Sequence, residues 1–282
     1  PEAPFLADLA MGFASIYSAE YADQLLQAGT PERLNGQPIG TGPFVFERYA
    51  KDAQVRYRGN PQYWQGAPAL QRLIFAITAD PNVRQQKLKA DDCQIALYPR
   101  PVDIPALKAD PALQVLELDS LLTAYIGINT RHPPLDDVRV RQALNLAFDR
   151  AAYLRAQYGE GGASLAVAPY PATLLGYNEQ LSPWPYDPAR ARRLLSDAGH
   201  QDGFKLSIWT RPGGGPTNPN PGIGAQMLQA DLAAIGIQAD IRVFEWGELI
   251  KRAKNGEHDL VFMGWAGDNG DPDNFLTPNL SC

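Results

Sequence analysis

The chain has 282 residues, of which 45% are hydrophobic and 20% charged, and its formal net charge is −6 at pH 7. This apolar share is ordinary for a packed globular protein and excludes a wholly disordered chain, and the length allows one large domain or two of ordinary size. The acidic balance disfavours a nucleic-acid-binding protein, and no apolar run approaches the roughly 18–20 residues that cross a bilayer.

The first 120 residues are expected to form helices and strands interrupted by proline and glycine. One helix is predicted over 18–29, between an N-cap at Ser18 and Gly29, and another over 80–90, starting at Asp80 and Pro81. The other elements expected here are strands at 45–48, 55–58, 73–77 and 115–118 and a short helix at 103–110. We place a domain boundary before a strand expected at 124–128, so the predicted domains are residues 1–120 and 121–282.

In the second half, the predicted helices and strands follow one another more regularly. Helices are predicted from Asp136 or Asp137 to Phe148, over 150–158 and over 187–199, with an irregular segment at 160–186. Strands then alternate with helices in the order β-α-β-α-β, and the predicted ranges are 204–210, 223–235, 237–243, 246–254 and 259–265. Crossovers of this length favour parallel strands, so the sequence indicates an α/β fold.

Two of these strands end in sequences that suggest a ligand site. In open α/β sheets, ligands bind beyond the carboxyl ends of the strands. Trp209 and Arg211 lie at the end of the first predicted strand, and Trp265 and Asp268 at the end of the third. A cation, an anion and two indoles around one crevice would suit a small zwitterion with an apolar part. The alternative is an ordinary turn-rich loop with solvated acids.

Signatures of catalysis, cofactor binding and metal binding are missing from the sequence. The acidic loop fails the EF-hand pattern counted from Asp268 or from Asp271, because neither register has glycine at the sixth position or glutamate at the twelfth. Another kind of calcium site stays open. No nucleophile elbow, phosphate loop or zinc spacing occurs, and His200 and His258 are expected at the surface. We therefore predict no catalytic residue, no cofactor and no metal.

Cys93 and Cys282 are the two cysteines of the sequence. They could pair with each other, remain free thiols, or each bond a cysteine outside the given chain. Composition alone leaves these three alternatives open.

Several motifs resemble one protein family. The segments 38–44 (PIGTGPF), 63–64 (YW) and 136–144 (DDVRVRQAL) resemble the solute-binding proteins of bacterial ABC importers for peptides, and 264–275 (GWAGDNGDPDNF) resembles their dipeptide-binding branch. The resemblance implies a two-lobed periplasmic binding protein fold, type II-like, in a monomer that is not an enzyme. It also implies an incomplete chain, which lacks the N-terminal portion of the first lobe and the C-terminal portion of the second.

The resemblance further implies what the whole protein does. It would capture di- and tripeptides by their free amino terminus and deliver them to an ABC transporter permease in the inner membrane. It would be periplasmic or lipid-anchored, with its signal peptide removed. Disulfides would join Cys93 to the missing N-terminal region and Cys282 to a cysteine slightly further along. Rival interpretations are a receptor of the same fold for haem, glutathione, a metal complex or another small amine, and a peptide hydrolase.

By the same resemblance, Asp268 pairs with the α-ammonium of the peptide and Trp265 lines the side-chain pocket. The extended peptide adds to a strand edge through main-chain hydrogen bonds, a mode that reads no side chains. That edge is formed by Gly264, Trp265, Ala266 and Gly267.

One position departs from the dipeptide-binding branch. Gly215 stands where relatives place an arginine that holds the ligand carboxylate. Either Arg211 takes over that role, or this end of the site is open and admits longer peptides or a different ligand. A charge-assisted pair to a carboxylate contributes about 1.5–3 kcal/mol, so this position bears on dipeptide selectivity.

Overall fold

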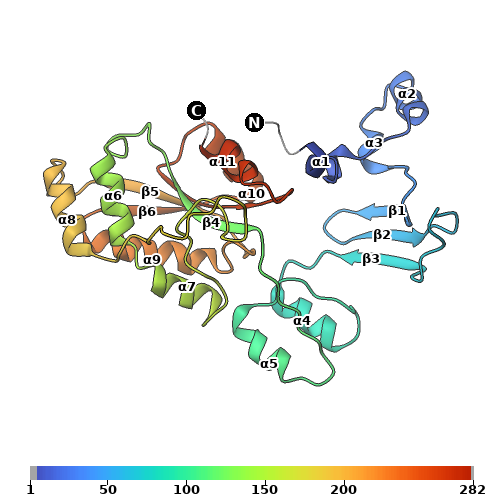
Figure 1. Cartoon of the computed structure of the whole chain (residues 1–282), viewed down its shortest axis with the longest axis horizontal. Coiled ribbons are helices and arrows are strands. Elements are labelled where there is room, and N and C mark those ends of the chain that lie inside the picture. The colour runs from blue at the N-terminus through green and yellow to red at the C-terminus, as the bar shows by residue number, and fades with distance from the viewer. Residues whose placement is uncertain (1–4, 281–282) are drawn as a thin grey trace. The chain divides into compact units, whose positions relative to one another are not determined.

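The computed structural model describes residues 5–280, and the chain divides into two compact units, residues 1–97 and 98–282 (Figure 1). The domain boundary predicted at 120/121 lies inside the second unit, and a lobe division there remains a prediction about the whole protein. Cys93 is a free thiol among the described residues, and Cys282 lies outside them. No helix within residues 5–280 combines the length and the apolar character needed to cross a bilayer.

The first unit contains a three-stranded antiparallel sheet. Its strands are β1 (Phe44–Ala50), β2 (Gln54–Gly59) and β3 (Arg72–Ala76), in the order β1-β2-β3. The helices of this unit are α1 (Phe5–Asp8), α2 (Ala19–Gln27), α3 (Arg33–Gly36) and α4 (Pro81–Lys89), with a 3₁₀ turn at Gly12–Ala14. The strands predicted at 45–48, 55–58 and 73–77 and the helices predicted at 18–29 and 80–90 are confirmed.

Two of these helices begin as the sequence predicts. The hydroxyl of Ser18 accepts a hydrogen bond from the backbone N–H of Tyr21, at 3.2 Å, at the start of α2. At α4, the carboxylate of Asp80 accepts from the backbone N–H groups of Asn82 and Val83, at 2.8 and 3.0 Å. Each cap satisfies N–H groups that have no partner within the helix.

The second unit contains a four-stranded sheet in the order β4-β7-β5-β6. β5 (Lys205–Thr210) pairs in parallel with β6 (Gln238–Val243) and β7 (Leu260–Ala266), whereas β4 (Leu122–Ile128) is antiparallel to β7. The predicted parallel β-α-β-α-β unit is thus confirmed.

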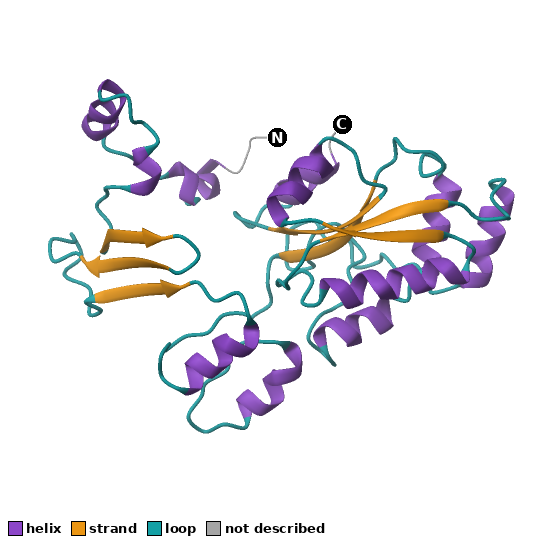
Figure 2. Cartoon of the chain, turned by 180° about the vertical axis from the view of Figure 1, so that it is seen from behind, coloured by secondary structure: helices purple, strands orange, loops and turns teal. Residues whose placement is uncertain are grey.

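Helices of the second unit lie on both sides of this sheet (Figure 2). The longer ones are α6 (Val138–Ala147), α7 (Arg150–Tyr158), α8 (Pro188–Asp197), α9 (Pro221–Ala234), α10 (Trp246–Lys254) and α11 (Asp273–Leu280). A 3₁₀ turn (Pro101–Asp103) and the short α5 (Ile104–Lys108) precede β4.

Side-chain alternation along β5 directs apolar groups to both faces of the sheet. Leu206 and Ile208 belong to the larger buried cluster, which also contains residues of α6, α8 and α9. Trp209 packs instead with Leu249 of α10 and Val261 of β7. β5 is therefore packed on both faces. This packing fixes the position of its carboxyl end at the edge of the sheet.

The structure differs from the sequence expectations at two places in this unit. Residues 115–118 form no strand, and Leu116 and Leu118 are 78% and 92% exposed. An extended apolar segment becomes a strand only where another strand supplies hydrogen-bond partners, and no described segment does so here. Residues 273–280, where no helix is predicted from the sequence, form α11, whose Phe275 is fully buried.

Candidate ligand-binding site

The three parallel strands of the second unit end at the same edge of the sheet. Thr210 at the end of β5 pairs in register with Val243 at the end of β6, and β7 runs in the same direction as β5. The segments that follow these ends carry Arg211, Trp246 and Asp268, respectively. A cation, an indole and an anion therefore follow three neighbouring strands at the edge where α/β sheets bind ligands.

The last part of β7 has one edge without a neighbouring strand. β4 pairs with every residue of β7, from Leu260 to Ala266, but β5 pairs only with Leu260 and Val261. Within the described residues, 262–266 have no strand on the β5 side. Backbone N–H and C=O groups at such an edge are available to an extended ligand. Gly264, Trp265 and Ala266 lie in this segment, as the strand-edge prediction requires.

Asn274 of α11 fixes the loop that follows β7. Its Oδ1 atom accepts hydrogen bonds from Nε1 of Trp265, at 3.2 Å, and from the backbone N–H of Asp268, at 3.1 Å. Gly267 donates its N–H to the carbonyl of Leu121 at 2.7 Å. The half-buried indole of Trp265 and the backbone of Asp268 are thus held by the same oxygen atom of Asn274. The site predicted from the sequence includes Trp265 and Asp268 but not α11.

The carboxylate of Asp268 is not part of this anchor. Its side chain is exposed, and no described residue is its hydrogen-bond or ion-pair partner. A carboxylate on a held backbone, with no internal cation to neutralise it, can pair with a cationic group of a ligand.

Arg211 lies beside two other residues of the site. Its guanidinium carbon is 5.1 Å from the centre of the Trp246 ring, a cation–π geometry. The guanidinium also occupies the space in front of the Cα atom of Gly215. No carboxylate within residues 5–280 forms an ion pair with Arg211.

A tight hairpin brings residues 215–218 across β7. Gly215 and Asn218 exchange backbone hydrogen bonds at 3.0 and 3.1 Å. The hydroxyl of Tyr158 on α7 donates to the carbonyl of Thr217 at 2.8 Å. A Cβ atom at Gly264 would lie 2.5 Å from Cβ of Thr217, so only glycine allows the hairpin to approach β7 this closely.

Trp209 does not line this site, and the prediction of a second indole there is wrong. Its side chain is fully buried, its Nε1–H donates to Oγ of Ser207 at 2.9 Å, and its ring centre lies 4.6 Å from that of Phe244. The alternation of β5 turns residue 209 toward α10, where an apolar cluster closes over it.

Next to Trp209 lies a partly buried polar network. Ser207 donates its hydroxyl to Oδ2 of Asp259 at 2.8 Å, and Oδ1 of Asp259 is 2.9 Å from Nδ1 of His132. The serine therefore contacts the acid and not a histidine, so the serine–histidine pair of a nucleophilic hydrolase is not formed here. His258, predicted at the surface, is partly buried and packs edge-on against Trp209, and His200 packs in the same way against Phe204.

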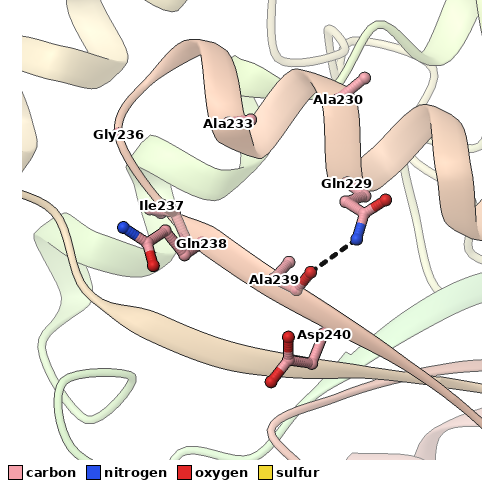
Figure 3. A pocket seen from close by; sticks show the side chains of 8 residues that line it. All are labelled: Gln229, Ala230, Ala233, Gly236, Ile237, Gln238, Ala239 and Asp240. Atoms are coloured by element: carbon pink, nitrogen blue, oxygen red, sulfur yellow. Dashed lines mark hydrogen bonds between the residues drawn. The ribbon is translucent and has the colours of Figure 1, made fainter.

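No group of three or more acidic, histidine or cysteine side chains among residues 5–280 could hold a metal ion. A hollow of about 550 Å³ lies elsewhere, between α9 and the amino-terminal end of β6 (Figure 3). There Nε2 of Gln229 donates to the carbonyl of Ala239 at 2.7 Å. Because β5 and β6 are parallel, this hollow and the Arg211 segment lie at opposite ends of the strands. Its lining residues are Gln229, Ala230, Ala233, Gly236, Ile237, Gln238, Ala239 and Asp240.

The fold and this strand-end site are those of an α/β ligand-binding protein, and comparison with known proteins specifies the class. Residues 2–282 match the family model described as bacterial extracellular solute-binding proteins, family 5 Middle. The chain therefore belongs to family 5 of the bacterial extracellular solute-binding proteins.

Individual relatives are named for peptides. The chain is 65% identical to di/tripeptide-binding protein 4 and 61% identical to probable di/tripeptide-binding protein 5, both of Pseudomonas aeruginosa (strain UCBPP-PA14). Each match covers 100% of this chain and 53% of the relative, so the chain spans about half the length of the curated relatives it matches.

Two solved structures share the fold closely. An ABC transporter-associated periplasmic binding protein from Helicobacter pylori, in complex with the peptide STSA, matches with a TM-score of 0.89 and 37% identity over 98% of this chain and 52% of that one. A dipeptide-binding protein from Pseudoalteromonas sp. SM9913, in complex with Met-Leu, matches with a TM-score of 0.89 and 35% identity over 97% of this chain and 54% of that one.

Proposed function

We propose that the whole protein is an extracytoplasmic solute-binding protein that captures di- and tripeptides by their free amino terminus and delivers them to an ABC transporter. The observation that carries this proposal is the exposed carboxylate of Asp268, which has no partner among the described residues and follows a β7 edge that no described strand occupies. The ammonium of a peptide would pair with the carboxylate while its main chain adds to the edge. The peptide-binding relatives support the same assignment.

The proposal extends to location, partners and chemistry. We expect a monomer in the periplasm, or anchored by lipid on the outer face of the membrane, that works with a permease of the inner membrane. We expect no catalysis, and the hydroxyl of Ser207, which donates to Asp259, contacts no histidine. Cys93 would bond a cysteine outside the 282 residues, which peptide mapping without reduction can test.

Recognition of the amino terminus is tested by calorimetry on the whole protein. L-alanyl-L-alanine should bind at least ten times more tightly than its N-acetylated form, because acetylation removes the positive charge. Asp268→Ala should weaken binding of the free dipeptide by about 2–5 kcal/mol, since the ammonium would lose its partner.

A matched control variant changes the net charge by the same amount at a residue outside the site. Asp202 is an exposed acid in the turn before β5, at the opposite end of that strand from Arg211. Asp202→Ala should leave both affinities unchanged. Equal affinity of the wild-type protein for the free and acetylated dipeptides would refute the proposal.

Peptide length is a separate question. The two related structures hold a peptide of four residues and one of two, so membership of the family does not fix the length. Native mass spectrometry of the whole protein as purified should show retained short peptides. Retained haem, glutathione or a metal complex would favour the rival receptor instead.

A further inference from the structure

Arg211 has an unusual position for a surface arginine, because its guanidinium fills the place that a side chain at residue 215 would take. Gly215 has no Cβ, and a Cβ built there would collide with Nη2 of Arg211 and lie 3.3 Å from its Cζ. The backbone at Gly215 is not left-handed, so its conformation does not demand glycine. The glycine is needed here for the room that it leaves to the guanidinium.

Trp246 contacts the same guanidinium. It is the first residue of α10, and its ring lies 5.1 Å from Cζ of Arg211. Stacking on an indole orients the plane of the guanidinium and leaves the N–H groups at its rim free to donate. The hairpin that carries Gly215 is itself fixed, by the two backbone hydrogen bonds between Gly215 and Asn218. The guanidinium thus lies close to both the Trp246 ring and the backbone of Gly215.

The charge of Arg211 has no internal anion to neutralise it. No acidic side chain within residues 5–280 pairs with it, although Asp268 follows β7, the strand next to β5 in the sheet. An oriented guanidinium presents a fork of N–H donors that matches a carboxylate. At one sheet edge the unit therefore offers an anion after β7 and a cation after β5, each without an internal partner.

From these contacts we propose that Arg211 binds the carboxylate end of the ligand and that Gly215 and Trp246 are positioning residues that hold its guanidinium in place. The proposal rests on the proposed function, and it narrows the ligand class to short zwitterions with a free carboxylate. The sequence leaves two possibilities for this end of the site, and the proposal selects the first. Arg211 takes over the role of the arginine that Gly215 replaces, so this end of the site is not open.

The test compares L-alanyl-L-alanine with its C-terminal amide, by calorimetry on the whole protein. The wild-type protein should bind the free acid about ten- to a hundredfold more tightly than the amide. Arg211→Ala should abolish this preference. Arg211→Lys should keep only part of it, because an ammonium lacks the planar fork.

Variants of the two positioning residues separate placement from general stability. Gly215→Ala needs only the flexible end of Arg211 to move, so the protein should fold normally and lose most of the preference for the acid. Gly247→Ala, on α10 with open space around it, is the matched control and should keep the full preference. Trp246→Ala should reduce the preference, and Trp246→Phe should restore part of it.

Two results would overturn the proposal about Arg211. Equal binding of the acid and the amide by the wild-type protein overturns the proposal, and so does a full acid preference in Gly215→Ala, which would show that the space at residue 215 is not used. The N-acetylated dipeptide is measured beside them. If discrimination against it persists while the acid preference is absent, only the present inference fails; if both are absent, the proposed function fails with it.

Discussion

At the scale of single residues, two histidines of the second unit lie near Asp259, and only His132 is hydrogen-bonded to it. Burial acts to raise the pKa of Asp259, but hydrogen bonds from His132 and Ser207 outweigh it and the pKa is lowered. The pKa of His258 is lowered for different reasons. Burial, and then the charge of nearby His132, lower its pKa, and Asp259 opposes them only in part. Its buried Nδ1 atom has no hydrogen-bond partner among the described residues.

The lowered pKa of His258 predicts a loss of stability in mild acid. The unfolded chain takes up the proton near pH 6.5, whereas the folded protein resists it until a lower pH. The free energy of unfolding should therefore fall as the pH drops below about 6.5 and level off below the folded pKa. His258→Gln should flatten this part of the profile, measured by urea unfolding of the whole protein between about pH 7 and 5.

His200→Gln is the control for that experiment, because this histidine packs against Phe204 outside the Asp259 network. The control variant should keep the slope of the wild-type protein. A slope that survives in His258→Gln and disappears in His200→Gln would contradict the prediction.

At the scale of elements, capped helices and apolar strands could be predicted from sequence because their causes are local. Asp80-Pro81 and Asp187-Pro188 each begin a helix, with the aspartate accepting from backbone N–H groups of the first turn. The same acid–proline pair occurs at Asp271-Pro272, just before α11, where Oδ1 of Asp271 accepts from the N–H of Asp273 at 2.8 Å. That start signal was available, but the neighbouring acids and glycines favoured a loop.

The site was predictable only in part, for a related reason. The parallel direction of strands follows from crossover lengths, so the sequence could place Arg211 and Asp268 at one edge. Packing between distant segments determines which face of β5 is covered by α10. Because of this packing, Trp209 is buried, whereas Trp246 is exposed beside Arg211. Gly215 could be noticed in the sequence, but the guanidinium that fills its space could not.

Close packing of α11 against the end of β7 predicts that Gly267 tolerates no side chain. A Cβ atom there would lie 2.6 and 2.8 Å from Cε2 and Cζ of the fully buried Phe275. Gly267→Ala should lower the free energy of unfolding by about 1–3 kcal/mol, since the ring or the strand end must shift. Gly247→Ala should be neutral or raise it by up to about 1 kcal/mol, because its Cβ meets open space in a helix. Equal effects of the two changes would show that contact with Phe275 is not the cause.

At the scale of the whole molecule, the two units differ in how much apolar surface they bury. Leu25 is the one buried apolar side chain among the described residues of the first unit, whereas Ile16, Trp64 and Ile95 are 97%, 77% and 79% exposed. The second unit contains an extended cluster that covers one face of its sheet and a smaller one on the other. Burial of apolar surface is the main force that offsets the entropy of ordering a chain, so the first unit gains little of it from residues 5–97.

This difference predicts unequal stability when residues 1–282 are expressed alone. Amide hydrogens of β5 should exchange slowly, because this strand has a neighbour on each side in the sheet and lies between two apolar clusters, while those of β1, β2 and β3 should exchange within seconds to minutes. Hydrogen exchange followed by mass spectrometry measures both sets in one sample. In the whole protein, whose curated relatives are about twice as long as this chain, the β1–β3 amides should become protected to the level of β5. Equal protection of both sheets in the 282-residue chain, with a single unfolding transition, would show instead that the first unit needs no further partner.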